Sequence, residues 1–460
     1  MKQLLLWMTL FLSFSCSSHS QERRDSLTST SPADTLPAVS LLSDTQPAPL
    51  SVSPADTLPA VSLLSDTLPA PLSVSPADTL PAVSLLSDTL RLLFVGDLMQ
   101  HQGQIDAART TRGYDYSACF AYVKEVISQA DFAVANLEVT LGGKPYRGYP
   151  AFSAPDEYLT AIHDAGFNVL LTANNHCLDR GRKGLERTLR LIDSLHIPAA
   201  GTYTDIEDRR TRYPLLLEKK GFRIALLNYT YGTNGIPVPS PAVVNLIDTT
   251  VIAQDIEKAR QLHPDVLLAC MHWGVEYQSL PGKEQQKLAQ WLFAKGVDHI
   301  IGAHPHVVQP IEVHTDSLTR QKRLVAYSLG NFISNMSARR TDGGLMLQME
   351  FVKTGAEKER TSLKGEKGKK EEEKKSWEEE KRGAQLKKCE YYLVWTDRPI
   401  HSKKKNHQIL PINFPADSLT VNSRNLLNLF TKDTRKLLDK ENKGIEEQFF
   451  YEKNSKKFGD

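Results

Sequence analysis

Six short apolar runs in this chain of 460 residues lead into side chains that could bind a metal ion. The ends of these runs combine carboxylate, amide and imidazole groups: Asp97, Glu138, Asn175, His272, His304, His306 and Asn331. One polar residue at a strand end is usually a cap, but six such ends in one chain are hard to assign to capping. Oxygen and nitrogen donors without a thiolate suit Mn²⁺, Fe²⁺, Zn²⁺ or Mg²⁺. A pair of such ions can clamp the attacking and leaving oxygens of a hydrolytic step.

The order of apolar and amphipathic segments indicates which elements position these groups. Between Leu90 and roughly Pro415, short apolar runs alternate with amphipathic segments of helix length. Buried strands that alternate with helices are typical of an α/β protein. In open α/β sheets the ligand crevice lies at the carboxyl ends of the strands, so we expect the polar groups to meet there.

Longer motifs surround the run ends. They are GDLM (96–99), ANLE (135–138), GFNVLLTANNHCLDRG (166–181), HWGVEY (272–277), GAHPHVVQPIE (302–312) and YSLGNF (327–332). In order and approximate spacing they resemble the CapA family of capsule, or poly-γ-glutamate, synthesis proteins, which are related to the calcineurin-like metallophosphoesterases. The resemblance spans about residues 91–351, with a weaker tail to about 412. It implies an α/β fold, a metallophosphoesterase-like four-layer sandwich of two β-sheets flanked by helices.

The resemblance also implies a role for each matched side chain. Asp97 stands at the first metal-binding carboxylate, Glu138 at the bridging carboxylate and His176 at the catalytic acid/base position. The remaining metal-ligand positions fall on Asn175, His272, His304 and His306. Phosphatases carry a histidine where this chain has Met99, and a thioether is a poor ligand for a hard ion. One metal site is therefore weakened, or His101 replaces the missing ligand.

These roles predict a hydrolytic or transfer reaction at an amide or phosphate centre. A divalent metal would lower the pKa of a water molecule toward neutrality, and that water would be the nucleophile. His176 would protonate the leaving group as a general acid, without binding the metal. The alternative for His176 is a loop histidine that orders the ANNH motif by hydrogen bonds.

Four further residues are candidate substrate contacts. Arg147, in GGKPYRGYP, could bind an anionic group through two hydrogen bonds. Glu276 and Tyr277 follow the HWG motif and could contact substrate or support a metal-bound histidine. Asn331, which ends the YSLGN run, completes this group.

The first 89 residues predict an export signal and a spacer. Residues 1–16 have one lysine, an apolar stretch and small residues before Cys16, which is the layout of a signal peptide. The junction at Cys16 resembles a bacterial lipoprotein cleavage site. We therefore predict a cell-envelope protein, lipid-anchored to the bacterial membrane, with secretion or a retained anchor as alternatives. In residues 17–89 a proline-rich segment recurs every 22 residues, which predicts a disordered stalk.

We place the CapA-like domain at residues 90–415, with a charged insertion at 353–388. Mixed charges dominate the insertion, so we expect it to be disordered and solvated between two neighbouring strands. Residues 416–460 contain an amphipathic stretch that predicts a C-terminal helix and tail, with Leu429 on the buried face.

Composition excludes two protein classes and leaves three functions open. Lys and Arg number 56 against 54 Asp and Glu, which argues against a nucleic-acid binder. Five scattered cysteines do not make a disulfide scaffold. The leading hypothesis is a surface protein in synthesis, export or anchoring of a capsule polymer, with an anionic polymer or the capsule-synthesis and export machinery as partner. The alternatives are a lipid-tethered metallophosphoesterase for small phosphate esters and a noncatalytic polymer-binding module.

Overall fold

The computed structural model describes residues 89–315, 321–353, 384–402 and 404–450. The predicted signal, Cys16, the repeats and residues 354–383 of the charged insertion lie outside these ranges. Within them, no helix is both long enough and apolar enough to cross a membrane.

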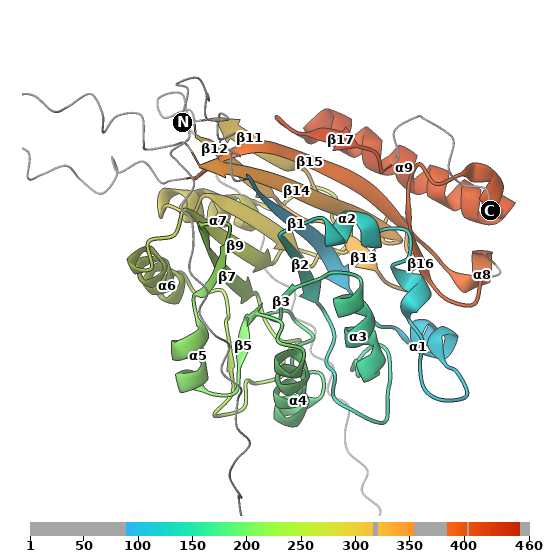
Figure 1. The fold of residues 1–460 in the computed structure, drawn as a ribbon, viewed down its shortest axis with the longest axis horizontal. Helices are drawn as coiled ribbons and strands as arrows, with labels where there is room; N and C mark the ends of the chain where they lie inside the picture. Colours follow the sequence, from blue (N-terminus) through green and yellow to red (C-terminus); the bar gives the residue numbers. More distant parts are fainter. Residues whose placement is uncertain (1–88, 316–320, 354–383, 403, 451–460) are drawn as a thin grey trace, which may run out of the picture. The chain divides into compact units, whose positions relative to one another are not determined.

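The larger sheet of the described residues has nine strands and joins the first and last parts of the domain (Figure 1). They are β1 (Thr89–Leu98), β2 (Phe132–Leu137), β3 (Val169–Leu171), β4 (Ala199–Ala200), β13 (Asn331–Ile333), β14 (Gly343–Lys353), β15 (Ala384–Asp397), β16 (Gln408–Pro411) and β17 (Glu446–Gln448). The main path runs β16-β15-β14-β1-β2-β3-β4, while β13 pairs with β1 and β17 with β15. Strands β1, β2 and β3 are parallel, so their carboxyl ends lie at one edge.

The second sheet has six strands in the described residues. They are β6 (Leu215–Lys219), β7 (Phe222–Thr230), β9 (Val266–His272), β10 (His299–Ala303), β11 (Ile311–Thr315) and β12 (Lys322–Ala326). The order is β11-β12-β10-β9-β7-β6, with β7, β9, β10 and β12 parallel. A separate short pair joins β5 (Thr202–Tyr203) to β8 (Val243–Val244). All six apolar runs that were predicted as strands are confirmed, three in each large sheet.

Helices flank the two sheets (Figure 1). They are α1 (Gln102–Ala108), α2 (Lys124–Ser128), α3 (Asp156–Asp164), α4 (Gly181–Ser194), α5 (Ile206–Arg212), α6 (Thr249–Gln261), α7 (Lys283–Ala294), α8 (Pro399–Ser402) and α9 (Val421–Glu441).

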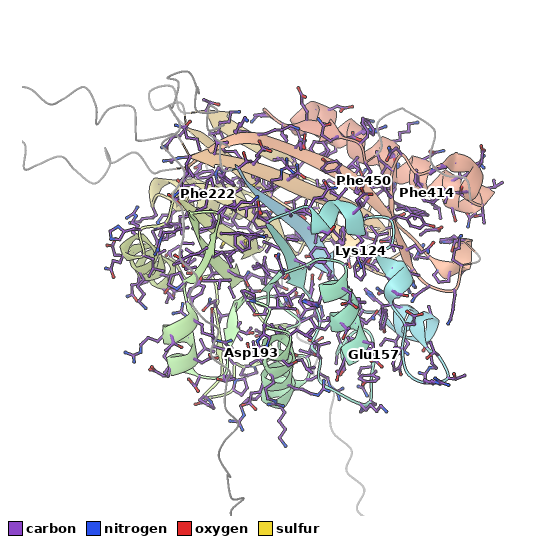
Figure 2. All side chains as sticks on the ribbon, in the orientation of Figure 1. Lys124, Glu157, Asp193, Phe222, Phe414 and Phe450 are labelled. Carbon is purple, nitrogen blue, oxygen red and sulfur yellow. The ribbon has the colours of Figure 1, made fainter. Side chains whose placement is uncertain are left out.

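Alternating side chains of the strands build two hydrophobic clusters. Phe94 of β1 packs in one cluster with Leu268 of β9 and Leu292 of α7. Leu93, the neighbour of Phe94, packs in the other cluster with Ile162 of α3, because successive strand residues point to opposite faces. Figure 2 shows how densely side chains fill the space between the layers. This arrangement confirms the predicted sandwich of two sheets flanked by helices.

The strands on either side of the charged insertion are neighbours, as predicted, but the insertion is shorter than predicted. Strands β14 and β15 pair antiparallel, with Lys353 opposite Ala384. The boundary at residue 388 is wrong, because Ala384 and Leu386 are buried in the sheet. Apolar and polar residues alternate at 384–387 and continue the strand, which the charge pattern of the insertion had concealed.

The C-terminal region is part of the domain. Helix α9 begins after Thr420, whose hydroxyl accepts a hydrogen bond from the backbone N–H of Ser423. Leu427 and Phe430 are buried as predicted, but Leu429 is 43% exposed, so its assignment to the packed face is wrong. The predicted tail contains β17, which pairs with β15 in the larger sheet.

Candidate metal centre

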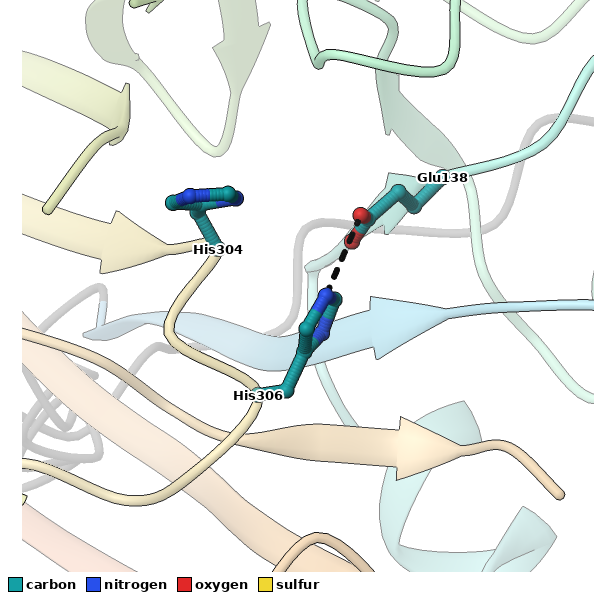
Figure 3. A group of neighbouring side chains, drawn as sticks. All are labelled: Glu138, His304 and His306. Carbon is teal, nitrogen blue, oxygen red and sulfur yellow. Dashed lines mark ion pairs between the residues drawn. The ribbon is translucent and has the colours of Figure 1, made fainter. Parts of the chain in front are cut away.

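The structure brings the predicted carboxylates and histidines together at the carboxyl ends of the strands. Two groups of buried side chains have ligand atoms within 4.8 Å of one another. One group is Asp97, Glu138 and His272, and the other is Glu138, His304 and His306. Figure 3 shows Glu138 facing the two histidines of the second group. Because Glu138 belongs to both groups, it lies where a bridging carboxylate must lie.

A close approach of two backbones places Asp97. Gly96 in β1 lies so near Gly330 that a Cβ atom would fall 1.9 Å from the Gly330 carbonyl oxygen. The backbone N–H of Asp97 donates to that oxygen at 3.0 Å. Only glycine at position 96 therefore allows β1 to reach the loop from the second sheet.

Both histidines of the HPH motif adopt an unusual backbone conformation. The φ angle is +99° at His304 and +58° at His306. Residues other than glycine rarely adopt a positive φ, because this conformation costs them about 1–3 kcal/mol each. Between them stands Pro305, and the two ring centroids lie 5.9 Å apart. The strained turn directs both imidazoles into one ligand group.

His306 is held so that one ring nitrogen faces Glu138. Its Nδ1 lies 3.0 Å from the Asn331 Oδ1 and 3.2 Å from the Asp97 Oδ2. The opposite nitrogen, Nε2, lies 3.8 Å from the Glu138 Oε1. The Asn331 amide donates to the Thr341 carbonyl at 2.8 Å, which fixes its Oδ1 toward His306. Asn331, predicted as a substrate contact, is fully buried behind His306.

His272 lies between an amide and a carboxylate. Its Nε2 is 2.7 Å from the Asn175 Oδ1 and 3.8 Å from the Glu138 Oε1. Its Nδ1 is 3.3 Å from the amide nitrogen of Asn136, which also donates to the Asp97 Oδ1 at 2.8 Å. Sequence reasoning missed this role of Asn136. Its position two residues before Glu138 was the available signal, because alternate strand residues share a face.

His176 and Asp179 form a buried pair beside the two groups. The His176 Nδ1 lies 2.8 Å from the Asp179 Oδ2, and both side chains are buried. The same Asp179 oxygen accepts a hydrogen bond from the backbone N–H of Phe152 at 2.8 Å. Neither ligand group in the described residues includes His176. Sequence reasoning missed this contact, although Asp179 follows His176 by only three residues.

Met99 and His101 contact residues outside the two ligand groups. Met99 packs in the second hydrophobic cluster. The His101 Nδ1 lies 3.3 Å from the Gln104 Oε1 and 3.3 Å from the backbone N–H of Asn335. Burial lowers the pKa of His101 to about 4. Neither ligand group found in the described residues contains His101, so the geometry favours a weakened site over its replacement of the missing ligand.

Comparison with known proteins identifies the family. Residues 91–336 match a family model described as bacterial capsule synthesis protein PGA_cap. The match spans more than half of the 460 residues. The chain belongs to the PGA_cap family. This confirms the resemblance that the strand-end motifs carry.

Relatives of this PGA_cap chain are named for capsule synthesis. It is 29% identical over 269 residues to the PGA biosynthesis protein CapA of Bacillus subtilis (strain 168), covering 57% of this chain and 68% of that protein. It is 27% identical over 277 residues to the capsule biosynthesis protein CapA of Bacillus anthracis, covering 58% of this chain and 65% of that protein. The matches therefore span about two thirds of each relative.

Solved structures with a similar arrangement are distant. The NAD nucleotidase of Haemophilus influenzae has a TM-score of 0.39 at 12% identity, covering 79% of this chain and 64% of that chain. The 5'-nucleotidase of Candida albicans SC5314 has a TM-score of 0.34 at 10% identity, covering 76% and 58%. The PGA_cap match, and not these structures, establishes the family.

Several polar atoms at the PGA_cap site are buried without a hydrogen-bond partner among the described residues. They are both carboxylate oxygens of Glu138 and the His304 Nδ1. Buried polar atoms are nearly always satisfied, because an unsatisfied one costs about 1–3 kcal/mol. Carboxylate and imidazole atoms that converge without partners are the donor set that a divalent ion needs.

The charge states of these groups also fit a cation between them. Burial and the neighbouring Asp97 raise the pKa of Glu138 well above its ordinary value. Burial and His304 lower the pKa of His272, while burial and His306 lower that of His304 to about 3. Imidazoles must be neutral to bind a metal. Burial opposes protonation of His306, but its bond to Asp97 outweighs this and raises its pKa.

Exposed tyrosines surround the centre. Tyr231 is 47% exposed, with its ring centroid 4.5 Å from that of His304. Tyr277, a predicted substrate contact, is 53% exposed and 6.3 Å from His306. Tyr149 is 73% exposed and 6.5 Å from His176. Sequence reasoning missed Tyr149 and Tyr231, since no spacing rule links their loops to the histidines.

The two charged residues that were predicted as substrate contacts differ in position. Glu276 is half-buried, and its charge acts on Glu138, His306 and Tyr277. Arg147 is exposed, and within the described residues its guanidinium has no ion pair. Its backbone pairs with Ser153 in the loop that carries Tyr149.

Proposed function

We propose that this chain acts at the cell envelope in synthesis, export or anchoring of a capsule polymer of the poly-γ-glutamate type, through a divalent-metal centre. The convergent ligand atoms that lack partners, above all both oxygens of Glu138, carry the proposal. The PGA_cap family and the names of the two Bacillus relatives support the polymer class.

The side chains that would hold the metal are Asp97, Glu138, Asn175, His272, His304 and His306. When bound, a divalent ion of this kind polarises an amide or phosphate oxygen and activates water for attack. The ligand atoms divide into two unequal sets that share Glu138. Asp97 and His272 belong to one set, where Asn175 contacts His272, whereas His304 and His306 belong to the other. Met99, which stands where phosphatases carry a histidine ligand, follows Asp97 by two residues. We expect the ion on the Asp97 side to bind more weakly.

His176 is the proton donor in this proposal. With Nδ1 donating to the Asp179 carboxylate, Nε2 is left to exchange a proton with the leaving group. Asp179 fixes the orientation of the ring, and its own position is fixed by the hydrogen bond from the Phe152 N–H. Asn331 and Asn136 act as positioning residues for His306 and His272.

Metal content and activity of two histidine variants test the proposal. We expect His304→Ala to lose bound metal and activity together. The matched control is His314→Ala, whose ring is exposed on β11 beside Glu312 and outside both ligand groups; it should keep both. If purified His304→Ala keeps the metal of the parent, the assignment of the centre is wrong.

A substrate screen separates the three functions. Turnover of γ-glutamyl amides or transfer of a γ-glutamyl chain supports the proposal, whereas turnover of phosphate esters alone favours a metallophosphoesterase. Absence of bound metal, with no turnover after Mn²⁺ or Zn²⁺ is added, favours a noncatalytic polymer-binding module. The buried pair of His176 and Asp179 supports an enzyme, because a binding module has no need of a positioned proton donor.

Lipid attachment at Cys16 is the localisation that we propose, and it rests on the sequence of residues 1–16. We expect Cys16→Ser to move the protein from the membrane fraction to the soluble fraction. If an immunoblot of the two fractions shows unchanged partitioning, lipid attachment at Cys16 does not anchor the protein to the membrane.

A further inference from the structure

The segment between β15 and β16 gathers cationic and imidazole groups that the metal centre does not use. Arg398, His401 and His407 lie in or beside the short helix α8, and Lys404 and Lys405 follow it. In Figure 1, α8 and α1 lie at the same end of the molecule. Helix α1 follows β1, whose carboxyl end carries Asp97 of the metal centre.

Arg398 is a half-buried guanidinium without a carboxylate partner. Its Nη2 lies 2.8 Å from the His401 Nε2, and its Nη1 lies 3.5 Å from the Asn335 carbonyl. Its Nε is buried with no hydrogen-bond partner in the described residues. An arginine at this depth is normally paired with a carboxylate or a phosphate, because its charge is costly to desolvate.

The two nearest carboxylates are engaged elsewhere. Asp342 accepts the indole N–H of Trp395 at 2.8 Å, and Asp397 accepts the Ser423 hydroxyl at 2.9 Å. Neither lies within 4.0 Å of the Arg398 guanidinium, although both act on it over a longer distance. Arg398 therefore has hydrogen-bonding capacity that no described acidic side chain fills.

His407 lies beside Arg398 and shares its contact with Asn335. It is 2% exposed, and its Nε2 lies 2.9 Å from the Asn335 Oδ1, whereas its Nδ1 has no partner among the described residues. Asn335 thus contacts both Arg398 and His407. The backbone N–H of Asn335 also donates a hydrogen bond to the His101 Nδ1 at 3.3 Å. Asn335 thus connects Arg398 and His407 to the segment that follows β1.

Lys404 and Lys405 extend the positive charge to the surface. Both are exposed, and neither forms an ion pair within the part of the chain that the structure describes. The acidic groups whose charges act on them are Asp397 and Asp115. Each of these carboxylates accepts a hydrogen bond from the hydroxyl of a nearby serine. The segment thus has one half-buried cation, Arg398, and two exposed cations that are consecutive in the sequence, Lys404 and Lys405.

We propose that Arg398, Lys404 and Lys405 form a binding site for carboxylate groups, and that it holds successive side chains of an acidic polymer beside the metal centre. The choice of poly-γ-glutamate as that polymer rests on the proposed function. One carboxylate binds at the half-buried Arg398 guanidinium, and the following carboxylates lie along the two lysines. A planar guanidinium suits a carboxylate because it can form two parallel hydrogen bonds.

Binding of a fluorescein-labelled oligomer of γ-linked glutamate to the full-length protein tests this site. We expect Arg398→Met to weaken binding about 10- to 100-fold, the usual effect of losing a charge-assisted hydrogen bond. The double variant Lys404→Ser/Lys405→Ser should weaken it by about 5-fold or more, and should do so less at high salt. The matched control Lys432→Ser/Lys436→Ser removes two exposed charges from α9 and should change the Kd less than twofold.

The outcomes separate this site from the metal centre. The loop variants should keep the metal content of the parent while they lose affinity for the oligomer. Should Arg398→Met fail to fold, the lysine pair decides, since both side chains are exposed. An unchanged Kd in the lysine variant overturns the site. Stronger competition by tripolyphosphate than by unlabelled glutamate oligomer overturns the choice of carboxylate and indicates a phosphate ligand.

Discussion

Replacement of Glu138 by glutamine should abolish the response of the protein to metal without unfolding it. Glu138 is fully buried, belongs to both ligand groups, and has no hydrogen-bond partner for either oxygen among the described residues. Glutamine has nearly the same shape but offers only one weak oxygen donor. One group would therefore lose its only carboxylate, and the other would lose one of two.

The expected size of the effect follows from mass action. At a metal concentration about 100 times its Kd, binding stabilises the folded parent by about 2.7 kcal/mol. A loss of about 100-fold in affinity reduces this stabilisation to about 0.4 kcal/mol at the same concentration. For a domain of this size, about 1 kcal/mol moves the Tm by roughly 2–4 °C. We therefore expect a metal-induced rise of about 5–10 °C in the parent and about 1–2 °C in Glu138→Gln.

Thermal melts of metal-stripped protein, with and without added Mn²⁺ or Zn²⁺, make this measurement. Without metal, Glu138→Gln should melt no lower than the parent, because the substitution removes a buried carboxylate that Asp97 repels. The control is Glu276→Gln, a half-buried carboxylate near the site but outside both ligand groups, which should keep the full rise. A parental rise and parental metal content in Glu138→Gln would refute the reasoning.

Three further changes test other parts of the structure. Ala in place of His176, or Asn in place of Asp179, should leave metal content unchanged and slow turnover by roughly 10²–10⁴, as expected for a lost general acid; loss of metal would contradict this. A short Gly/Ser turn in place of residues 354–383 should leave the Tm within a few degrees of the parent, because β14 and β15 already pair at that end; a collapse in solubility would show that the segment packs. His407 is buried next to Arg398, which lowers its pKa from 6.5 to about 3, so the unfolded chain binds one more proton between these values. The contribution of His407 to the free energy of unfolding is therefore complete above pH 6.5 and falls by about 1.4 kcal/mol for each pH unit of acidification. Urea unfolding should show that the parent loses about 2 kcal/mol at pH 5 through this residue, whereas His407→Gln does not. Equal losses in the two proteins would contradict this prediction.

Local pattern in the sequence was enough to predict the strands and most of the polar residues that meet at their carboxyl ends. Apolar runs of strand length are visible without a structure, and the polar groups that end them fall at the carboxyl ends of parallel strands. His304 and His306 could be assigned to one centre because only a proline separates them. Glu138 could be placed from the ANLE motif alone.

Contacts between distant segments could not be predicted in the same way. The pairing of Asn331 with His306, and of Arg398 with Asn335, depends on where the two sheets and the last loop lie, and no periodicity encodes that. The charged residues at 384–388 concealed a strand because charge predicts solvent contact and not backbone pairing. Tertiary structure alone decided which polar atoms are buried without partners, since burial is a property of all the layers together. It is this property that makes Glu138 a metal ligand and Arg398 a binding residue in our proposals.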